Sequence, residues 1–355
     1  MYCDYSYTYR SKKSNDSLFY FLKRYKKMNP ISKEKIQNFS DFIDNHEYFY
    51  IIGHKEPDGD CIASCLGLAE IIKNKGKEYK LLSAGPFKRV EIKKYSELFS
   101  NEMDFLLDEE IKKTGLIICD CSEFKRLGEI EGSFENIDTF IVDHHKTADC
   151  PAGAQAIIDS TCPAASLLVQ LLYENIIGPL TKEIAEVLYF GTMTDTGFFR
   201  FLSSNDGDVL VQISRMLNAG ADPRKTYDYI TSGKSYSTRK LLGVLLNHAE
   251  QYLDGKLIVT YETMEDTKKL GQEGRDSDAL YSSLLAVNNV EAVVFLRQET
   301  ETTCTGGLRS RDKVDVSIVA SKFGGGGHKN ASGLSTNGKL DSLIPAIVKE
   351  FAKII

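Results

Sequence analysis

The sequence predicts an α/β protein with a larger, doubly wound parallel-sheet domain followed by a smaller mixed α/β domain. Three observations predict this fold class. The length of 355 residues exceeds the usual size of a single hydrophobic core. Short apolar runs alternate with helical patterns over the first half of the chain, as in parallel sheets with helical crossovers. The last hundred residues or so mix strand and helix patterns and contain a glycine run.

The first domain is predicted from short runs of aromatic and β-branched residues, which are typical of buried strands. These runs are Tyr48–Ile52, 79–83, 116–119, 139–142 and Gln155–Ile158. Helical patterns precede, separate or follow them at 32–46, 62–75, 88–107, 122–130, 163–173, 181–191 and 206–219. Strands joined by helices in this way favour a parallel sheet with helices on both faces.

The domain boundaries follow from changes in pattern along the chain. Residues 1–28 are rich in Tyr, Lys and Ser, and we expect a flexible extension there. Residues 29–234 form the predicted catalytic domain, 235–250 a linker helix, and 251–355 the second domain. That domain contains strand patterns at 256–262, 291–298 and 302–308, and helix patterns at 277–287, 315–323 and 340–351.

Composition restricts the class of protein and its surroundings. Hydrophobic residues at 42% and charged residues at 26% are ordinary for a soluble globular protein. A net charge of −6 argues against binding of long duplex nucleic acid, which requires a broad basic face. Eight cysteines without a pairing pattern indicate a reducing compartment, and we expect Cys119 and Cys121 to be buried small hydrophobes. With no membrane-length apolar run and no signal-peptide pattern, we expect no membrane partner and a cytoplasmic location.

Polar residues gather where the predicted strands end. His54, Asp58 and Asp60 follow the first strand, and ligands of open α/β sheets bind at the carboxyl ends of strands. The alternative for Asp58-Gly59-Asp60 is a turn in which Asp60 caps the next helix. Asp120 ends the third strand, Asp143-His144-His145 ends the fourth, and Asp195 follows a helix. Any one of these residues could be a local cap, but their recurrence favours a common site.

The residue types in this set indicate a metal site. Four carboxylates cannot lie close together in the charged form without cations to balance them. Two divalent ions would balance them, with histidines completing mixed nitrogen and oxygen shells. A donor set without thiolate suits Mn²⁺ or Mg²⁺, and the histidines favour Mn²⁺. The acidic candidates are Asp58, Asp60, Asp120 and Asp195, and the histidine candidates are His54 and His144.

These motifs, in this order, resemble the four motifs of the DHH phosphoesterase superfamily. They are His54-x3-Asp58-x-Asp60, Asp120, Asp143-His144-His145 and Thr194-Asp195-Thr196-Gly197. The C-terminal stretch from Gly324 to Gly333, preceded by Gly307-Leu308-Arg309-Ser310, resembles the DHHA1 domain. The resemblance covers about residues 30–355. Within the superfamily, the length resembles the NrnA-like group of bifunctional oligoribonucleases and 3′-phosphoadenosine-5′-phosphate phosphatases.

The resemblance implies a role for each metal-type residue. His54 and Asp58 would bind one ion, His144 and Asp195 the other, and Asp120 would bridge them. Asp60 would belong to the charge that joins the two ions. His145 would face the substrate phosphate as a proton donor or electrostatic stabiliser, and Asp143 would orient a histidine.

The resemblance also implies substrate-binding residues in both domains. Arg126 would lie near the scissile phosphate, although a solvated helix position is an equal alternative. Arg309, Gly326, Gly327 and His328 would bind a terminal phosphate, since a glycine run lets backbone N–H groups approach an anion closely. The alternative for the glycine run is a flexible loop. Cys121 and Glu123, after Asp120, depart from the pattern of the oligoribonuclease group and leave base preference open.

The function implied is a Mn²⁺-dependent phosphoesterase with its active site in the cleft between the two domains. Its partners would be short single-stranded oligonucleotides or nucleotides, cleaved to 5′-mononucleotides, with 3′-phosphoadenosine-5′-phosphate as a further substrate. The alternatives are a cyclic dinucleotide phosphodiesterase and a nucleotide sensor with an inactive site. The C-terminal motif argues against a family II pyrophosphatase. Association as a homodimer stays open.

Overall fold

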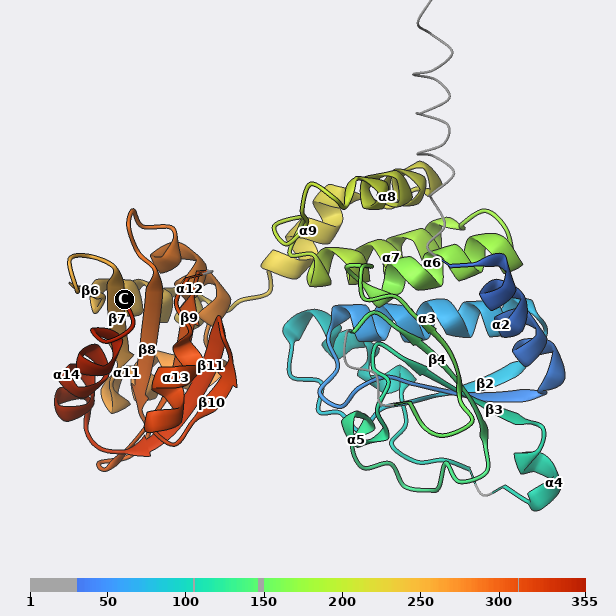
Figure 1. Cartoon of the computed structure of the whole chain (residues 1–355), viewed down its shortest axis with the longest axis horizontal. Coiled ribbons are helices and arrows are strands. Elements are labelled where there is room, and N and C mark those ends of the chain that lie inside the picture. The colour runs from blue at the N-terminus through green and yellow to red at the C-terminus, as the bar shows by residue number, and fades with distance from the viewer. Residues whose placement is uncertain (1–30, 105, 146–149, 312) are drawn as a thin grey trace, which may run out of the picture. The chain divides into compact units, whose positions relative to one another are not determined.

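The computed structural model describes residues 31–104, 106–145, 150–311 and 313–355 (Figure 1). The extension predicted for residues 1–28 lies outside the described residues. The chain divides into two compact units, Met1–Gly233 and Lys234–Ile355. Among the described helices, none combines the length and the apolar character that crossing a membrane requires.

The first unit contains a five-stranded sheet in the order β2-β1-β3-β4-β5, with every pair of neighbours parallel. Its strands are β1 (Tyr48–Ile52), β2 (Glu78–Leu82), β3 (Thr114–Cys119), β4 (Asp138–Asp143) and β5 (Gln155–Ile158). The predicted parallel sheet is therefore confirmed. The order changes direction between β1 and β3, which is where doubly wound sheets open a binding crevice at their carboxyl edge.

Alternation along the strands produces two separate cores. Phe49 and Ile51 of β1 face the core that helices cover, whereas Tyr50 and Ile52 face the opposite side. The helices on the first face are α2 (Lys33–Asn45), α3 (Gly59–Asn74), α6 (Ala165–Ile176) and α7 (Lys182–Asp195), with α8 (Gly207–Ala219) and α9 (Pro223–Thr231) beyond them (Figure 1). The second face is covered by irregular segments and by two short helices, α4 (Asp108–Ile111) and α5 (Phe124–Leu127).

Two helical predictions in this unit are wrong. The segment predicted as a helix over 88–107 is a 3₁₀ helix only over Val90–Leu98. Beyond it the backbone bonds to the end of β2, since Ser100 N–H donates to Leu81 O (3.0 Å) and Ser83 N–H to Ser100 O (2.9 Å). The helix predicted over 122–130 shortens to α5, because Gly128 ends it with a φ of 82°.

The second unit is built on a six-stranded mixed sheet in the order β10-β11-β9-β8-β7-β6. Its strands are β6 (Glu250–Tyr252), β7 (Leu257–Glu262), β8 (Ala292–Gln298), β9 (Thr303–Ser310), β10 (Gly326–His328) and β11 (Ala331–Asn337). Its helices are α10 (Tyr236–Asn247), α11 (Met264–Leu270), α12 (Ser277–Leu285), α13 (Val316–Lys322) and α14 (Leu340–Phe351). Helix α10 contributes Leu241 and Leu245 to a core with Ile258 and Leu280, so it packs within this unit.

Candidate active site

The first turn of α3 places the acidic residues that follow β1. Asp58 is the N-cap of α3, and its Oδ1 accepts hydrogen bonds from the N–H groups of Asp60 and Cys61 (both 3.1 Å). The alternative in which Asp60 caps this helix is therefore wrong. Asp60 instead accepts from the N–H groups of Ala165 (2.6 Å) and Ser166 (3.0 Å), at the start of α6. A fully buried carboxylate on one helix thus caps another, whose own N-cap residue is alanine.

Glycines allow helices α3 and α7 to approach closely at the site. A Cβ atom at Gly59 would lie 2.4 Å from Thr194 Oγ1, and one at Gly191 would lie 2.5 Å from the Ala63 Cβ. Neither contact is tolerable for a larger residue at these backbone positions. The Gly between the two aspartates therefore brings the start of α3 against the end of α7, where Asp195 is the last residue.

Asp120 lies at the centre of the site, directly after β3. Its backbone has a φ of 56°, a left-handed conformation that is uncommon outside glycine. Its Oδ2 lies 3.4 Å from His54 Nε2 and its Oδ1 lies 3.2 Å from His144 Nε2. The residue is only 2% exposed, and within the described chain Oδ1 accepts no hydrogen bond. One buried carboxylate therefore faces two imidazoles, one with each oxygen.

The two imidazoles are held in the same way. His54 Nδ1 lies 2.9 Å from Lys55 O, and His144 Nδ1 lies 3.1 Å from Cys162 O. A carbonyl can only accept, so each Nδ1 carries the proton and donates it. Each Nε2 then points to the carboxylates: for His54 to Asp58 Oδ1 (3.9 Å), and for His144 to Asp195 Oδ2 (3.5 Å) and Asp60 Oδ2 (4.0 Å).

His145 is held differently, by a carboxylate. Its Nδ1 donates to Asp143 Oδ1 at 2.7 Å, and the same oxygen accepts from the N–H groups of His144 (2.8 Å) and His145 (3.1 Å). Asp143 is fully buried, whereas a third of the His145 side chain is exposed. Asp143 therefore fixes the ring of His145 with Nε2 left for another partner.

The crowding of charges perturbs the histidine pKa values. Burial is the largest effect and opposes a charged imidazole, but the neighbouring carboxylates outweigh it. Asp120 and Asp58 raise the pKa of His54 to about 12. Asp120, Asp60 and Asp195 raise the pKa of His144 to about 10. In the absence of cations, protons on these rings therefore supply the positive charge that the cluster requires.

The acids respond to the same crowding in opposite directions. Burial and the neighbouring Asp120 and Asp195 raise the pKa of Asp60 well above its ordinary value. Burial likewise raises the pKa of Asp195 to about 6, with Asp120 adding to this and His144 opposing it. Burial also opposes the charged form of Asp58, but its contact with His54 lowers the pKa below the ordinary range. Several carboxylates thus compete for few positive charges in a buried cluster, and bound cations would balance them.

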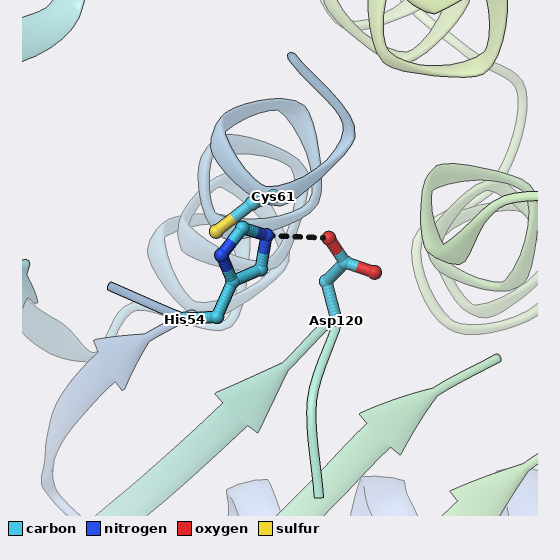
Figure 2. Close-up of side chains that lie close together, drawn as sticks. All are labelled: His54, Cys61 and Asp120. Atoms are coloured by element: carbon cyan, nitrogen blue, oxygen red, sulfur yellow. Dashed lines mark ion pairs between the residues drawn. The ribbon is translucent and has the colours of Figure 1, made fainter. Parts of the chain in front are cut away.

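The donor set fits divalent cations. Among the described residues no hydrogen bond reaches the buried Asp120 Oδ1, and the Nε2 atoms of two imidazoles face the Asp120 carboxylate. Three groups of side chains offer ligand atoms that lie within 4.8 Å of one another. They are His54, Cys61 and Asp120; Asp120, His144 and His145; and Asp60, His144 and Asp195. Cys61 is the residue that sequence reasoning missed, because its proximity to His54 and Asp120 depends on how α3 lies against the ends of β1 and β3 (Figure 2).

A polar pocket lies within the second unit and has a volume of about 500 Å³. Arg309 and Gly326 line it, whereas Gly327 and His328 are not among its lining residues. The glycine run is not the loop considered from the sequence, since its last two residues belong to the edge strand β10. Arg126 is on α5, and its backbone carbonyl accepts from Lys55 N–H (2.7 Å), beside His54.

The charge of Arg309 distinguishes it from its neighbours in this pocket. Arg275 pairs with Glu262 and Arg297 with Glu299. Arg309 lies over the ring of Tyr281, 4.8 Å from its centroid, and donates to Leu308 O and Ser332 O. In the described part of the chain no carboxylate pairs with it. The pocket therefore contains an uncompensated guanidinium, the group that best recognises phosphate or carboxylate.

Comparisons with known proteins agree with both parts of this arrangement. The family model for the DHH family, N-terminal domain, matches residues 48–192, and the DHHA1 domain model matches residues 254–355. The bifunctional oligoribonuclease and PAP phosphatase NrnA of Thermus thermophilus is 31% identical over 293 residues, which cover 81% of this chain and 84% of that protein.

Two solved structures show the same fold. An exopolyphosphatase-related protein from Bacteroides fragilis has a TM-score of 0.77 at 26% identity, covering 91% of this chain and 97% of that one. The exonuclease RecJ bound to manganese has a TM-score of 0.55 at 15% identity, covering 92% and 96%. The chain belongs to the DHH family, with a DHHA1 domain at its C-terminus, and is a metal-dependent phosphoesterase.

Proposed function

We propose that this protein hydrolyses short oligoribonucleotides, such as the linear dinucleotide pApA, to 5′-mononucleotides. We propose 3′-phosphoadenosine-5′-phosphate as a second substrate. The observation that carries the proposal is Asp120, a buried carboxylate whose two oxygens face two imidazoles at 3.2 and 3.4 Å. The similarity to the Thermus NrnA, whose name gives both activities, supports this choice of substrates.

Two divalent cations, with Mn²⁺ favoured, would be held on either side of Asp120. One side has His54 and Asp58, and the other has His144 and Asp195, with Asp60 beside them. When bound, such a pair activates a water molecule and stabilises the charge of an in-line phosphoryl displacement. The chain contributes the two imidazole Nε2 atoms already aimed at the centre, because each Nδ1 is fixed by a backbone carbonyl.

His145 would act on the substrate and not as a metal ligand. Its Nδ1 is already engaged with Asp143 at 2.7 Å, so only Nε2 has a free position. Since about a third of the side chain is exposed, a phosphate oxygen or leaving group can reach it. It would donate a proton or a hydrogen bond to the scissile phosphate, and Asp143 would hold the ring in the required tautomer.

The Arg309 pocket would bind the part of the nucleotide that is not cleaved. A guanidinium without a carboxylate partner attracts a terminal phosphate. The ring of Tyr281 and the carbonyl of Leu308 hold the Arg309 guanidinium in place. Such an anchor would favour substrates that carry a terminal phosphate. We propose Arg126 as a further phosphate contact on α5.

The test is a substrate panel with purified full-length protein and Mn²⁺. It compares pApA, a short RNA oligomer, cyclic di-AMP and 3′-phosphoadenosine-5′-phosphate, with products identified by chromatography. We expect AMP from pApA at a higher kcat/KM than any product from cyclic di-AMP. Preference for cyclic di-AMP would establish the cyclic dinucleotide phosphodiesterase instead, and binding without turnover of any substrate would indicate a sensor.

A further inference from the structure

A left-handed turn follows Asp195, the last residue of α7. Gly197, Phe198 and Phe199 have φ angles of 55°, 52° and 72°. Residues other than glycine rarely adopt this conformation, and those that do are usually isolated. Two aromatic residues in succession are therefore held in a strained backbone close to a proposed metal ligand. Strain of this kind persists where the surrounding structure enforces it, and it gathers at functional sites.

Contacts on both sides of the turn enforce its conformation. Phe198 N–H donates to Met193 O (3.0 Å), within α7. The ring of Phe198 meets the ring of Tyr227, on α9, edge to face with 5.1 Å between the centroids. Phe201 N–H donates to the carbonyl of the fully buried Thr196 (3.2 Å). The turn therefore packs Phe198 against α9 and holds the backbone of Phe201 against the residue that follows the proposed metal ligand.

The result of this turn is an exposed aromatic ring beside the candidate active site. Phe201 is 69% exposed. A Cβ atom at Gly197 would lie 2.6 Å from Phe201 Cε2, so the ring rests on this glycine while most of it faces solvent. The guanidinium carbon of Arg200 lies 5.5 Å from the centroid of the ring, and Arg200 Nε donates to Gly197 O (3.1 Å). A flat apolar surface with a positive charge next to it is thus fixed near Asp195.

We propose that Phe201 is a stacking surface for a nucleobase of the substrate and contributes to the choice of nucleotides over other phosphoesters. Proteins that bind unpaired bases stack them on exposed aromatic side chains, and every base has a π face that can stack. The positive charge of Arg200 suits the phosphate that accompanies such a base. The proposal rests on the proposed function, because it requires a nucleotide substrate, and it names a residue that contacts the base.

The role assigned to Phe201 differs from that of the metal-type residues. Cations and carboxylates act on the phosphate group, whatever group is attached to it. A stacking surface adds affinity only for ligands that carry a base. Because stacking tolerates any base, Phe201 should favour nucleotides in general and should not by itself restrict the enzyme to one base.

The first test uses the absence of tryptophan from the sequence. Phe201→Trp introduces a single indole, whose fluorescence a stacked base quenches. We expect AMP to quench this fluorescence in the full-length protein with Mg²⁺, and ribose 5-phosphate, which lacks the base, to leave it unchanged. Tyr79→Trp is the matched control. Tyr79 is 36% exposed in the same unit but lies near the amino end of β2, whereas the site lies at the carboxyl edge of the sheet, so AMP should not change its emission.

Substitutions that keep or remove the aromatic ring give a second readout, by calorimetric titration with the same two ligands. Phe201→Ala should weaken AMP binding about 5- to 150-fold. Phe201→Leu should recover little of this loss, because leucine is apolar but has no π face, whereas Phe201→Tyr should bind AMP as the wild type does. The affinity for ribose 5-phosphate should be the same in all of these proteins.

Three results would overturn the proposal: absence of quenching by AMP, equal quenching by ribose 5-phosphate, or unchanged AMP affinity in Phe201→Ala. Equal loss of affinity for both ligands in Phe201→Ala would also overturn it, because the ring would then support the fold and not the base. Circular dichroism of each variant verifies folding. Both readouts measure binding of AMP, so failure of pApA hydrolysis leaves this proposal testable, and absence of stacking leaves the phosphoesterase reaction standing.

Discussion

Asp143 offers the sharpest test of the proposed chemistry, because it contacts the proposed acid and lies outside the predicted ligand set. It is fully buried, and its Oδ1 accepts three hydrogen bonds, the shortest at 2.7 Å from His145 Nδ1. Asp143→Asn keeps the size of the side chain and removes its charge. We expect the orientation of His145 to be lost while the sheet remains intact.

The magnitude follows from the hydrogen bond that is removed. A hydrogen bond to a charged group contributes about 1.5–3 kcal/mol. If this energy holds His145 in its productive tautomer, kcat should fall about 10- to 150-fold, at about 1.36 kcal/mol per tenfold. His145→Ala removes the group itself and should lower kcat about 100-fold or more. The double variant should be no slower than His145→Ala, since Asp143 acts through that ring.

The assay measures kcat on pApA together with metal content by elemental analysis. His248→Ala is the matched control, because His248 Nδ1 is bonded to a backbone carbonyl (Tyr261 O, 3.0 Å) in the second unit. It should retain kcat. Loss of one metal equivalent in His145→Ala would make His145 a ligand and refute its assigned role. An unchanged kcat in Asp143→Asn would refute the orientation argument.

Three further predictions concern metal, stability and substrate. Excess EDTA should abolish turnover, and Asp120→Asn should fold without binding metal; full activity in EDTA would exclude the metal mechanism. In EDTA, Asp60→Ala should lower the free energy of unfolding by about 1–3 kcal/mol for each orphaned N–H group at the start of α6. Asp195→Asn should instead raise the free energy of unfolding of the metal-free protein at neutral pH. Burial raises the pKa of Asp195 to about 6, with His144 opposing this shift and Asp120 adding to it. The folded protein therefore binds this proton more tightly than the unfolded chain does, and the metal-free protein loses stability as the pH rises from 3.8 through about 6. Chemical denaturation across this pH range checks both signs, and equal effects of the two variants would contradict them. Arg309→Ala should weaken binding of pApA by about 1.5–3 kcal/mol and leave hydrolysis of bis-p-nitrophenyl phosphate unchanged. Arg311→Ala is the control and should change neither. Equal losses on both substrates in Arg309→Ala would exclude an end-anchoring role.

Much of the fold is readable in the sequence because the apolar runs are short and separated by helical patterns. The five strands of the first sheet lie within two residues of their predicted bounds. One helical error, over 88–107, falls where backbone hydrogen bonds go to distant partners. Ser100 bonds to Leu81 and Ser83 at the end of β2, and no local pattern encodes that choice. The strand β10 was missed because glycines have little β propensity, and pairing with β11 decides its conformation.

The candidate site was largely readable for a similar reason. Residues that end parallel strands meet at one edge of the sheet, so His54, Asp120 and His144 come together whatever the details of packing. The residue type then indicates the chemistry, since imidazoles and carboxylates at one edge suggest cations. By itself the sequence therefore determined the fold class, the order of motifs and the set of candidate ligands.

Only the tertiary structure decided which partner each of these residues contacts. Asp58 and Asp60 are two residues apart, yet one caps its own helix and the other caps α6, more than a hundred residues away. In the sequence Cys61 has the pattern of an ordinary helix residue, whereas the packing of α3 against the ends of β1 and β3 brings its sulfur near His54 and Asp120. The physical reason is that capping and coordination depend on distances of a few ångströms between elements, which packing sets and local sequence patterns do not encode.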